Sequence, residues 1–302
     1  MTSWSELVER GIAHRQAPLH SFTTYKLGGP AAVLVEVEGV EDLEGVAAAL
    51  ESEPLPILVV GRGSNLVVAD AGFPGVVLHL GSNFGGVEVG EVVIAGAALG
   101  LPQVARAATK EGRLGLEFMV GIPGSVGGGI RQNAGCFGQD MSGVLLNAEV
   151  FDLEAGQRRT LPVEGLDYSY RSSSIRSHHV VLSGRFATTS GDPAVGELRI
   201  REITRWRRLH QPGGTLNAGS VFKNPPGDAA GRIIDELGLK GLRIGGAMVS
   251  EKHANFFVAM PGTRAIEVYL LVRAVIDTVK EETGIVLEPE IQFAGDFDAD
   301  VR

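Results

Sequence analysis

The segment LNAGSVFKNPPGD, residues 216–228, places a single serine between a run of small residues and a pair of prolines. Small residues before Ser220 allow a ligand to come close to the backbone, and the proline pair ends the strand that the segment would otherwise continue. Lys223 and Asn224 add two long polar side chains three and four residues after the serine. No histidine lies beside Ser220 in the sequence, so its hydroxyl is interpreted as a nucleophile, as a proton donor in a walled pocket, or as a turn residue bonded to its own backbone.

Length and composition describe a soluble globular chain with an excess of glycine. The 302 residues allow two or three domains of about 100 residues each. Glycine contributes 42 residues, roughly twice the usual share of about 7%. Such a glycine content is typical of a protein that wraps a large ligand, and equally of a loop-rich fold.

The net charge of −9 argues against a general nucleic-acid binder, because phosphate contacts require an excess of Lys and Arg. One basic segment stands out, RIREITRWRRLH at residues 199–210, with five arginines. It indicates either a site for a small anionic ligand or a solvated helix face.

The single cysteine, Cys136, excludes an internal disulfide and favours a reducing compartment. The first residues carry acidic side chains and no apolar core, so no secretory signal is expected. No apolar run approaches the roughly 18 residues of a membrane span. The sequence therefore predicts a cytoplasmic protein without membrane association.

Hydrophobic periodicity predicts an α+β chain in three parts, residues 1–77, 78–197 and 198–302. Strands are expected at 32–37, 57–60, 66–68, 76–80 and 180–186, and hairpins at 87–95 and 147–161. Helices are expected at 41–50, 101–111, 199–210, 229–237 and 263–283, with Asp228 as the N-cap of the fourth.

Two glycine-rich loops could present backbone N–H groups to a phosphate-bearing cofactor: GRGSN, residues 61–65, and GIPGSVGGG, residues 121–129. The first is not a Rossmann fingerprint, because it lacks the third glycine and is followed by a strand pattern rather than a helix. Each loop could also be an ordinary turn, but two of them in one chain favour a dinucleotide held between them. No P-loop motif is present.

Eight motifs together give the chain a family resemblance. They are TTYKLGGPA (23–31), VVGRGSNLVV (59–68), GIPGSVGGG (121–129), QNAGCFG (132–138), YSYRSS (168–173), NAGSVFKNPPGDAAGRIIDELGLKG (217–241), GGAMVSEKHANF (245–256) and LEPEI (287–291). In this order they resemble the UDP-N-acetylenolpyruvoylglucosamine reductases, the MurB family of peptidoglycan precursor synthesis. The resemblance covers residues 23–295 and fits the family's short form, which lacks an extra tyrosine-bearing loop.

The resemblance implies a vanillyl-alcohol-oxidase-like FAD-binding fold. Residues 1–77 and 78–197 would be its two α+β subdomains, and 198–302 the substrate-binding domain. It also implies FAD and NADPH as cofactors, a UDP-sugar enolpyruvyl ether as substrate, no nucleic-acid partner, and a monomer. The implied cofactor-binding residues are Gly61, Arg62, Gly63, Ser64, Asn65, Gly121, Ile122, Pro123, Gly124, Ser125, Gly127, Gly128 and Asn133.

Three residues match the catalytic positions of the family: Arg171, Ser220 and Glu290. A guanidinium fork suits a carboxylate that gains negative charge, and a serine can protonate a carbanion if a neighbour assists it. A carboxyl group of raised pKa could hydrogen-bond the same charge. Glu288 and Glu290 share one face of an extended segment, and only the resemblance selects Glu290.

The resemblance also implies a set of substrate contacts, and the chain departs from the family at two positions. The expected contacts are Tyr170, Arg208, Lys223, Asn224 and His253. Arg62 stands where a small residue is expected, so its side chain either clamps the phosphates or points away from them. Cys136 stands where alanine is common and is expected to pack as a small apolar group.

Two alternatives remain open from the sequence. Ser220-x-x-Lys223 formally matches the S-x-x-K pattern of serine acyl enzymes. That pattern needs a helix, whereas this segment is predicted to be extended. The second alternative is an FAD-dependent oxidase of the same fold that acts on another substrate.

Overall fold

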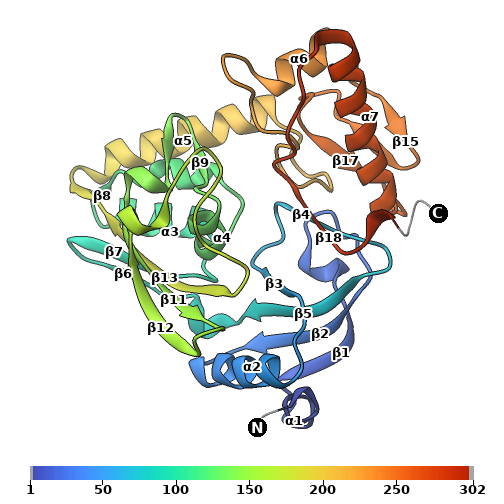
Figure 1. Cartoon of the computed structure of the whole chain (residues 1–302). Helices are drawn as coiled ribbons and strands as arrows, with labels where there is room; N and C mark the ends of the chain where they lie inside the picture. Colours follow the sequence, from blue (N-terminus) through green and yellow to red (C-terminus); the bar gives the residue numbers. More distant parts are fainter. Residues whose placement is uncertain (1–2, 299–302) are drawn as a thin grey trace. The chain divides into compact units, whose positions relative to one another are not determined.

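A computed structural model of the chain, which describes residues 3–298, contains two compact units that interleave along the sequence (Figure 1). Unit 1 comprises Met1–Gln16, Val33–Arg62 and Gly75–Arg207, and unit 2 comprises Ala17–Ala32, Gly63–Pro74 and Arg208–Arg302. The first predicted part, 1–77, begins with residues 1–2, and the third, 198–302, ends with residues 299–302. These terminal residues lie outside the described residues. The α+β class is confirmed. The division into three consecutive parts stays a prediction.

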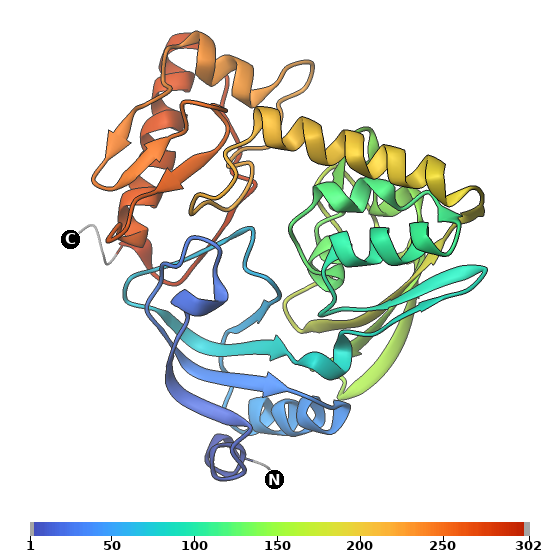
Figure 2. The same cartoon turned by 180° about the vertical axis from the view of Figure 1, so that it is seen from behind.

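The first sheet of unit 1 has four strands in the order β1 (Ala13–Pro18), β2 (Pro30–Val37), β5 (Phe73–Leu80) and β3 (Ile57–Val60). Strands β3 and β5 are parallel, as expected for strands joined by a crossover rather than by a tight hairpin. Helix α2 (Val40–Ser52) lies beside this sheet, next to the short helix α1 (Trp4–Glu9) (Figure 2). Leu43, Val46 and Ala49 form the buried face of α2, which confirms the predicted amphipathic helix.

The second sheet of unit 1 is antiparallel and has five strands in the order β12 (Gln157–Pro162), β11 (Leu145–Asp152), β13 (His179–Ala187), β7 (Val92–Gly96) and β6 (Val87–Val89). Both predicted hairpins are confirmed by the β6–β7 and β11–β12 pairs. Helices α3 (Leu101–Lys110) and α4 (Val126–Arg131) belong to the same unit. Two short pairs complete it: β8 (Arg113–Leu114) with β14 (Thr189–Ser190), and β9 (Gly135–Cys136) with β10 (Gln139–Asp140).

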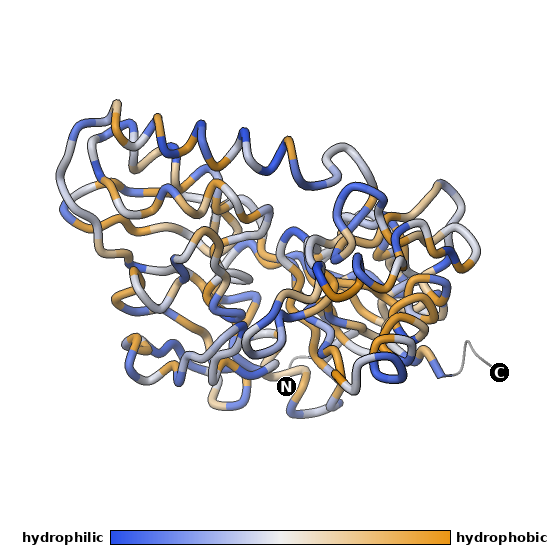
Figure 3. Tube along the Cα trace, turned by 90° about the horizontal axis from the view of Figure 1, so that it is seen from above, coloured by the Kyte–Doolittle hydropathy of each residue, from blue (hydrophilic) through white to orange (hydrophobic). Residues whose placement is uncertain are grey.

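Helix α5 (Pro193–His210) contains the arginine-rich segment. Gly196, Ile200 and Ile203 are its buried residues. Figure 3 shows hydrophilic and hydrophobic positions alternating along this helix. Most of its arginines are exposed, which fits both a solvated helix face and a site for an anionic ligand. Arg207 is the exception, because it is half-buried.

Unit 2 contains a three-stranded antiparallel sheet in the order β15 (Arg243–Ile244), β16 (Ala247–Val249) and β17 (Phe257–Ala259). Strand β18 (Gln292–Ala294) pairs in parallel with β4 (Leu66–Val68). Helix α7 (Ala265–Thr283) buries a stripe that includes Val268, Leu271, Val272, Val275 and Val279. This confirms the predicted helix, although Ile276 of the predicted stripe is only partly buried.

The predicted N-cap of α6 is wrong by one residue. Helix α6 spans Ala230–Glu236, and its N-cap is Ala229, which has no side-chain oxygen. Asp228 instead pairs with Arg232, one helical turn further on. The cap oxygen comes from Asn224, whose Oδ1 accepts a hydrogen bond from the N–H of Ala230 at 3.1 Å. The predicted stop is confirmed, because Gly238 follows the helix with φ of +68°.

Within residues 3–298, none of the helices is both long enough and apolar enough to cross a membrane.

The backbone at Gly63 generates a stability prediction. Gly63 has φ of +59°, and a Cβ placed on it would collide with the carbonyl oxygen of Phe22. Gly11 has φ of +73° and no atom within 4 Å of such a Cβ. Gly11→Ala should therefore cost only the left-handed penalty of about 1–2 kcal/mol. Gly63→Ala should cost at least about 1 kcal/mol more, because backbone must also move. Urea unfolding of both variants measures the difference, and equal losses would contradict the close-contact argument.

Candidate functional site

The two predicted glycine loops meet in unit 1 at Gly61 and Ser125. A Cβ on Gly61 would collide with the Ser125 hydroxyl oxygen, so only glycine allows this approach. Ser125 is 3% exposed and pairs with Gly100 in an isolated β-bridge. The guanidinium of Arg62 reaches the same place, since a Cβ on Gly100 would lie 2.7 Å from its Nη1. The Arg62 guanidinium thus lies beside Gly100, the bridge partner of Ser125.

The second loop is in part a helix. Helix α4 begins near the middle of this loop, and Ser125 is its N-cap. The Ser125 hydroxyl accepts a hydrogen bond from Gly128 N–H at 3.3 Å. Several of its glycines serve packing, because a Cβ on Gly127 would meet Ala97 at 3.0 Å and one on Gly129 would meet Leu101 at 2.9 Å. Gly128 is exposed, and apart from its chain neighbours and the backbone of its own helix only the Ser125 hydroxyl oxygen lies within 4 Å of a Cβ built on it. Packing therefore explains part of the glycine content, and exposed main chain remains around Ser125.

The rest of the first loop belongs to unit 2, where it contacts the Glu290 segment. The Asn65 amide donates to the carbonyl oxygen of Glu290 at 2.9 Å, and Gln292 N–H donates to the carbonyl oxygen of Asn65 at 2.9 Å. The nearest atom to a Cβ on Gly219 would be the carbonyl oxygen of Ser64, at 3.9 Å. Asn65 therefore joins the first loop to the acidic segment, a role that the sequence does not reveal.

Ser220 and Glu290 lie on neighbouring extended segments of unit 2. Glu290 N–H donates to the carbonyl oxygen of Val221 at 2.7 Å, and Lys223 N–H donates to that of Glu288 at 2.9 Å. On the other side Ser220 pairs with Phe256, and Val221 N–H donates to the Asn255 carbonyl oxygen at 2.9 Å. The serine segment is therefore held by isolated β-bridges and is not helical, so it lacks the helix that an S-x-x-K mechanism requires.

The two candidate carboxylates have different surroundings. The side chain of Glu288 is 69% exposed and forms an ion pair with Lys223. Glu290 is half-buried. The structure therefore separates two residues that the sequence pattern places on one face.

Asn255 holds the serine segment, and sequence reasoning did not single it out. This side chain is 4% exposed. Its Oδ1 accepts from Phe222 N–H at 2.9 Å, and its Nδ2 donates to the Phe222 carbonyl oxygen at 2.8 Å. The side-chain amide of Asn255 thus binds both the N–H and the carbonyl group of Phe222, as a neighbouring main chain would in a sheet. Asn255 lies inside the GGAMVSEKHANF motif, which was the available signal.

Arg171 lies in unit 1 and is fixed by main-chain carbonyl groups. Its Nη2 donates to the carbonyl oxygen of Gly135 at 2.8 Å, and its Nη1 lies 3.5 Å from that of Asn133. The guanidinium also lies over the ring of Tyr170, 5.0 Å from the centroid. Arg171 and Asn133 have φ of +58° and +45°. Such left-handed non-glycine residues cost free energy and cluster at functional sites.

Asn133 links the QNAGCFG and YSYRSS motifs. Its amide donates to the carbonyl oxygen of Ser169 at 3.0 Å, and its Oδ1 accepts from Ser142 N–H at 3.0 Å. The side chain is 3% exposed. These bonds give Asn133 a structural function beside Arg171, in addition to any contact with a cofactor.

Cys136 and Arg207 are neighbours in unit 1. The Cys136 thiol donates to the Phe118 carbonyl oxygen at 3.0 Å, and burial raises the pKa of this thiol to about 11. Burial also lowers the pKa of the Arg207 guanidinium. Sequence reasoning selected Arg208, which is exposed. Helical phase, rather than composition, distinguishes these two arginines.

The remaining predicted substrate contacts are divided between the units. Tyr170 of unit 1 is 51% exposed. In unit 2, Lys223 pairs with Glu288, and Asn224 caps α6. His253 accepts a hydrogen bond from Asn255 N–H at 3.2 Å, and burial lowers the pKa of its imidazole.

Comparison with known proteins identifies similar sequences over most of the chain. A family model described as UDP-N-acetylenolpyruvoylglucosamine reductase, C-terminal domain, matches residues 211–294, and an FAD binding domain model matches residues 31–161. The UDP-N-acetylenolpyruvoylglucosamine reductase of Erythrobacter litoralis is 40% identical over 288 residues, which cover 95% of this chain and 88% of that protein. Reductase 2 of Symbiobacterium thermophilum is 41% identical over 287 residues, which cover 94% and 93% of the two chains.

A solved structure is similar as well. The crystal structure of UDP-N-acetylenolpyruvylglucosamine reductase (MurB) from Thermus caldophilus aligns with a TM-score of 0.81 at 37% sequence identity. The alignment covers 94% of this chain and 98% of that one.

The Asn255 amide generates a second stability prediction. Asn255→Ala leaves the N–H and the carbonyl group of Phe222 buried without their partner, so the free energy of unfolding should fall by about 2–4 kcal/mol. Asn83→Ala is the control, because Asn83 is exposed and its amide binds one carbonyl oxygen. That variant should lose less than about 0.5 kcal/mol. Similar losses in both variants, measured by urea unfolding, would remove Asn255 from this structural role.

Proposed function

The chain belongs to the UDP-N-acetylenolpyruvoylglucosamine reductase family, and on that premise we propose that it reduces UDP-N-acetylglucosamine enolpyruvate to UDP-N-acetylmuramate with NADPH. It is an FAD-dependent oxidoreductase of peptidoglycan precursor synthesis. The observation that carries this function is the similarity of about 40% identity over 95% of the chain, which spans both the FAD-binding and the C-terminal family models. The oxidase alternative has no comparable support.

The residues around Ser125 fit an FAD diphosphate. A diphosphate requires N–H, hydroxyl and cationic donors without side chains in its way. Exposed Gly61 and Gly128 offer main chain without side chains, and exposed Arg62 supplies a cation beside Ser125. When bound, FAD supplies two-electron chemistry between NADPH and the enolpyruvyl double bond. We propose further contacts to it from Gly63, Ser64, Asn65, Gly121, Ile122, Pro123, Gly124, Gly127 and Asn133.

We propose that Arg171 stabilises the negative charge that develops on the enolpyruvyl carboxylate. A guanidinium is permanently charged and binds a carboxylate through two parallel hydrogen bonds. The bond to Gly135 and the contact with Asn133 set the orientation of the fork before substrate arrives. Pre-oriented charge of this kind need not reorganise during the reaction.

We propose that Ser220 protonates the substrate carbon. We also propose that Glu290 hydrogen-bonds the enolpyruvyl carboxylate on which the negative charge develops. The two segments are neighbours in unit 2 through the bond between Glu290 N–H and the Val221 carbonyl oxygen. A serine hydroxyl is a weak acid, so it needs such a polar neighbour to donate efficiently. This adjacency supports the pairing of the two roles.

For the UDP part of the substrate we propose Tyr170, Arg208, Lys223, Asn224 and His253. Lys223 can contact a phosphate if it exchanges its ion pair with exposed Glu288. The amide nitrogen of Asn224 would donate to the substrate, because the cap of α6 uses the oxygen. We also propose a monomeric enzyme, as the family resemblance implies, and a cytoplasmic location, which the single cysteine supports.

The proton-donor role predicts a divided kinetic phenotype for Ser220→Ala. Reduction of the flavin by NADPH should remain unchanged, whereas reoxidation by the enolpyruvyl substrate should slow by at least about 100-fold, the scale of lost general-acid catalysis. Stopped-flow absorbance near 450 nm separates the two half-reactions. Ser82→Ala, at an exposed serine, is the matched control and should leave both rates unchanged. Normal reoxidation in Ser220→Ala would exclude this serine from proton transfer.

Because the two carboxylates have different surroundings, we expect Glu290→Gln and Glu288→Gln to affect the rate of substrate reduction differently. Glu290→Gln should slow substrate reduction by about 10²-fold or more, whereas Glu288→Gln should leave kcat within a few-fold, because Glu288 is exposed and paired with Lys223. Steady-state kinetics at saturating NADPH measure both effects. The reverse ranking would assign the role to Glu288.

A further inference from the structure

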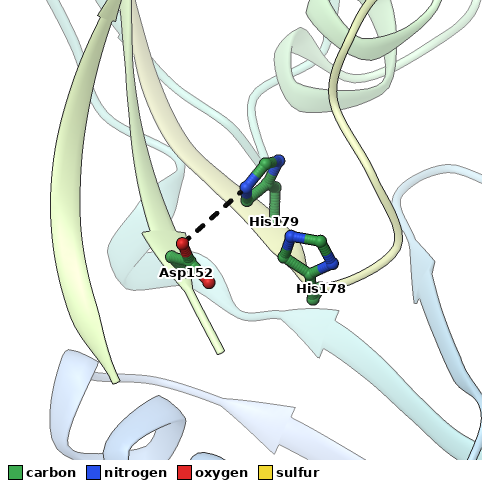
Figure 4. A group of neighbouring side chains, drawn as sticks. All are labelled: Asp152, His178 and His179. Carbon is green, nitrogen blue, oxygen red and sulfur yellow. Dashed lines mark ion pairs between the residues drawn. The ribbon is translucent and has the colours of Figure 1, made fainter. Parts of the chain in front are cut away.

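A second polar cluster lies in unit 1, at the end of β11 and the start of β13. Figure 4 shows its members, Asp152, His178 and His179. One ligand atom from each residue lies within 4.8 Å of those of the other two. The roles proposed above use none of these residues.

The strand register builds this cluster. Asp152 and His179 are directly opposite in the antiparallel β11–β13 pair, so their side chains project from the same face of the sheet. Leu153 N–H donates to the His178 carbonyl oxygen at 2.9 Å, which holds His178 beside them. The two imidazole rings have centroids 4.2 Å apart.

Two of the three side chains are already oriented by neighbours. The Oδ1 of Asp152 accepts from the N–H groups of Glu154 and Ala155 at 3.1 and 3.2 Å, while its Oδ2 lies 3.9 Å from His179 Nε2. Glu154 Oε1 lies 3.2 Å from His178 Nδ1. A carboxylate behind a histidine is the usual outer-shell partner of a metal-bound imidazole.

We propose that Asp152, His178 and His179 bind a divalent transition-metal ion. Two imidazoles and one carboxylate suit Zn²⁺ and related ions, whereas Ca²⁺ and Mg²⁺ prefer all-oxygen ligands. Bond lengths of about 2.0–2.2 Å in a tetrahedral zinc site separate the ligand atoms by about 3.3–3.6 Å. The 3.9 Å between His179 and Asp152 requires a movement of roughly half an ångström, and the other separations, which lie within 4.8 Å, require at most about 1.5 Å, which side-chain rotation supplies. The side chains of His178, His179 and Asp152 are 21%, 17% and 7% exposed, so an ion can reach them.

Two existing contacts compete with the ion. Arg159 Nη2 lies 3.2 Å from Asp152 Oδ2, and Arg176 N–H donates to His179 Nδ1 at 3.2 Å. A metal at His179 Nε2 requires that nitrogen to be unprotonated, so Nδ1 must carry the proton and Arg176 N–H must turn to solvent. The Arg159 side chain is 47% exposed, so water can replace its contact. The loss of the main-chain bond from Arg176 is a cost that the metal–nitrogen bond must offset.

The test is Zn²⁺ binding by the full-length, flavin-loaded protein after treatment with a chelator, measured by isothermal titration calorimetry. The wild type should bind one equivalent, and His178→Gln and His179→Gln should each weaken binding at least about 10-fold. Arg159→Gln should bind more tightly, because the competing cation is gone. His14→Gln is the matched control, since His14 also lies 3.9 Å from a carboxylate, that of Glu36, and should leave binding unchanged.

Retention of full binding by both histidine variants, loss of binding in His14→Gln, or no binding by the wild type would overturn the proposal. Co²⁺ gives a second measurement on the wild type and Arg159→Gln, which do not depend on the folding of the histidine variants. Absorption bands typical of nitrogen and oxygen ligands are expected. A thiolate charge-transfer band would assign the ion to Cys136 and overturn the proposal.

Discussion

Main-chain hydrogen bonds on both sides of residues 220–223 hold the serine segment, and the candidate site of unit 2 depends on them. Residues 255–256 bind one edge of this segment and residues 288–291 bind the other. The buried amide of Asn255 completes the pairing at Phe222, where a regular ladder bond is missing. A short segment with both edges occupied has little freedom to move. The Ser220 and Glu290 segments are therefore positioned mainly by backbone pairing, which the side-chain amides of Asn255 and Asn65 complete.

In unit 1 the candidate residues are positioned differently, by close approach of two loops and by strained backbone conformations. Gly61 and Ser125 meet because no side chain stands between them. Arg171 and Asn133 adopt left-handed backbone conformations that cost about 1–3 kcal/mol each. The hydrogen bonds of Asn133 to Ser169 and Ser142 offset part of that cost. Precise placement of a guanidinium thus requires support from two motifs that are distant in sequence.

The sequence predicts regular elements well where hydrophobic periodicity is strong. The expected helix at 101–111 matches α3 (Leu101–Lys110), and the expected strand at 57–60 matches β3 (Ile57–Val60). Helix α4 could not be predicted, because glycine has a low helix propensity and tertiary packing against Ala97 and Leu101 overrides it. The cap of α6 was missed for a similar reason, since its oxygen comes from Asn224. A hydrogen bond between residues far apart in the chain, such as that between Asn255 and Phe222, leaves no local pattern in the sequence.

The choice between Glu288 and Glu290 illustrates how structure adds to a motif. In an extended segment both residues share a face, so alternation cannot separate them. Lys223 separates them, because its N–H binds the carbonyl oxygen of Glu288 and its ammonium group binds the carboxylate of the same residue. A carboxylate that is exposed and committed to an ammonium group is poorly suited to donate a hydrogen bond to a developing charge. Glu290 is half-buried, and its own N–H is bonded to the residue that follows Ser220. The same pairing that fixes the serine segment therefore also holds the Glu290 segment, which supports the proposed choice of Glu290 over Glu288.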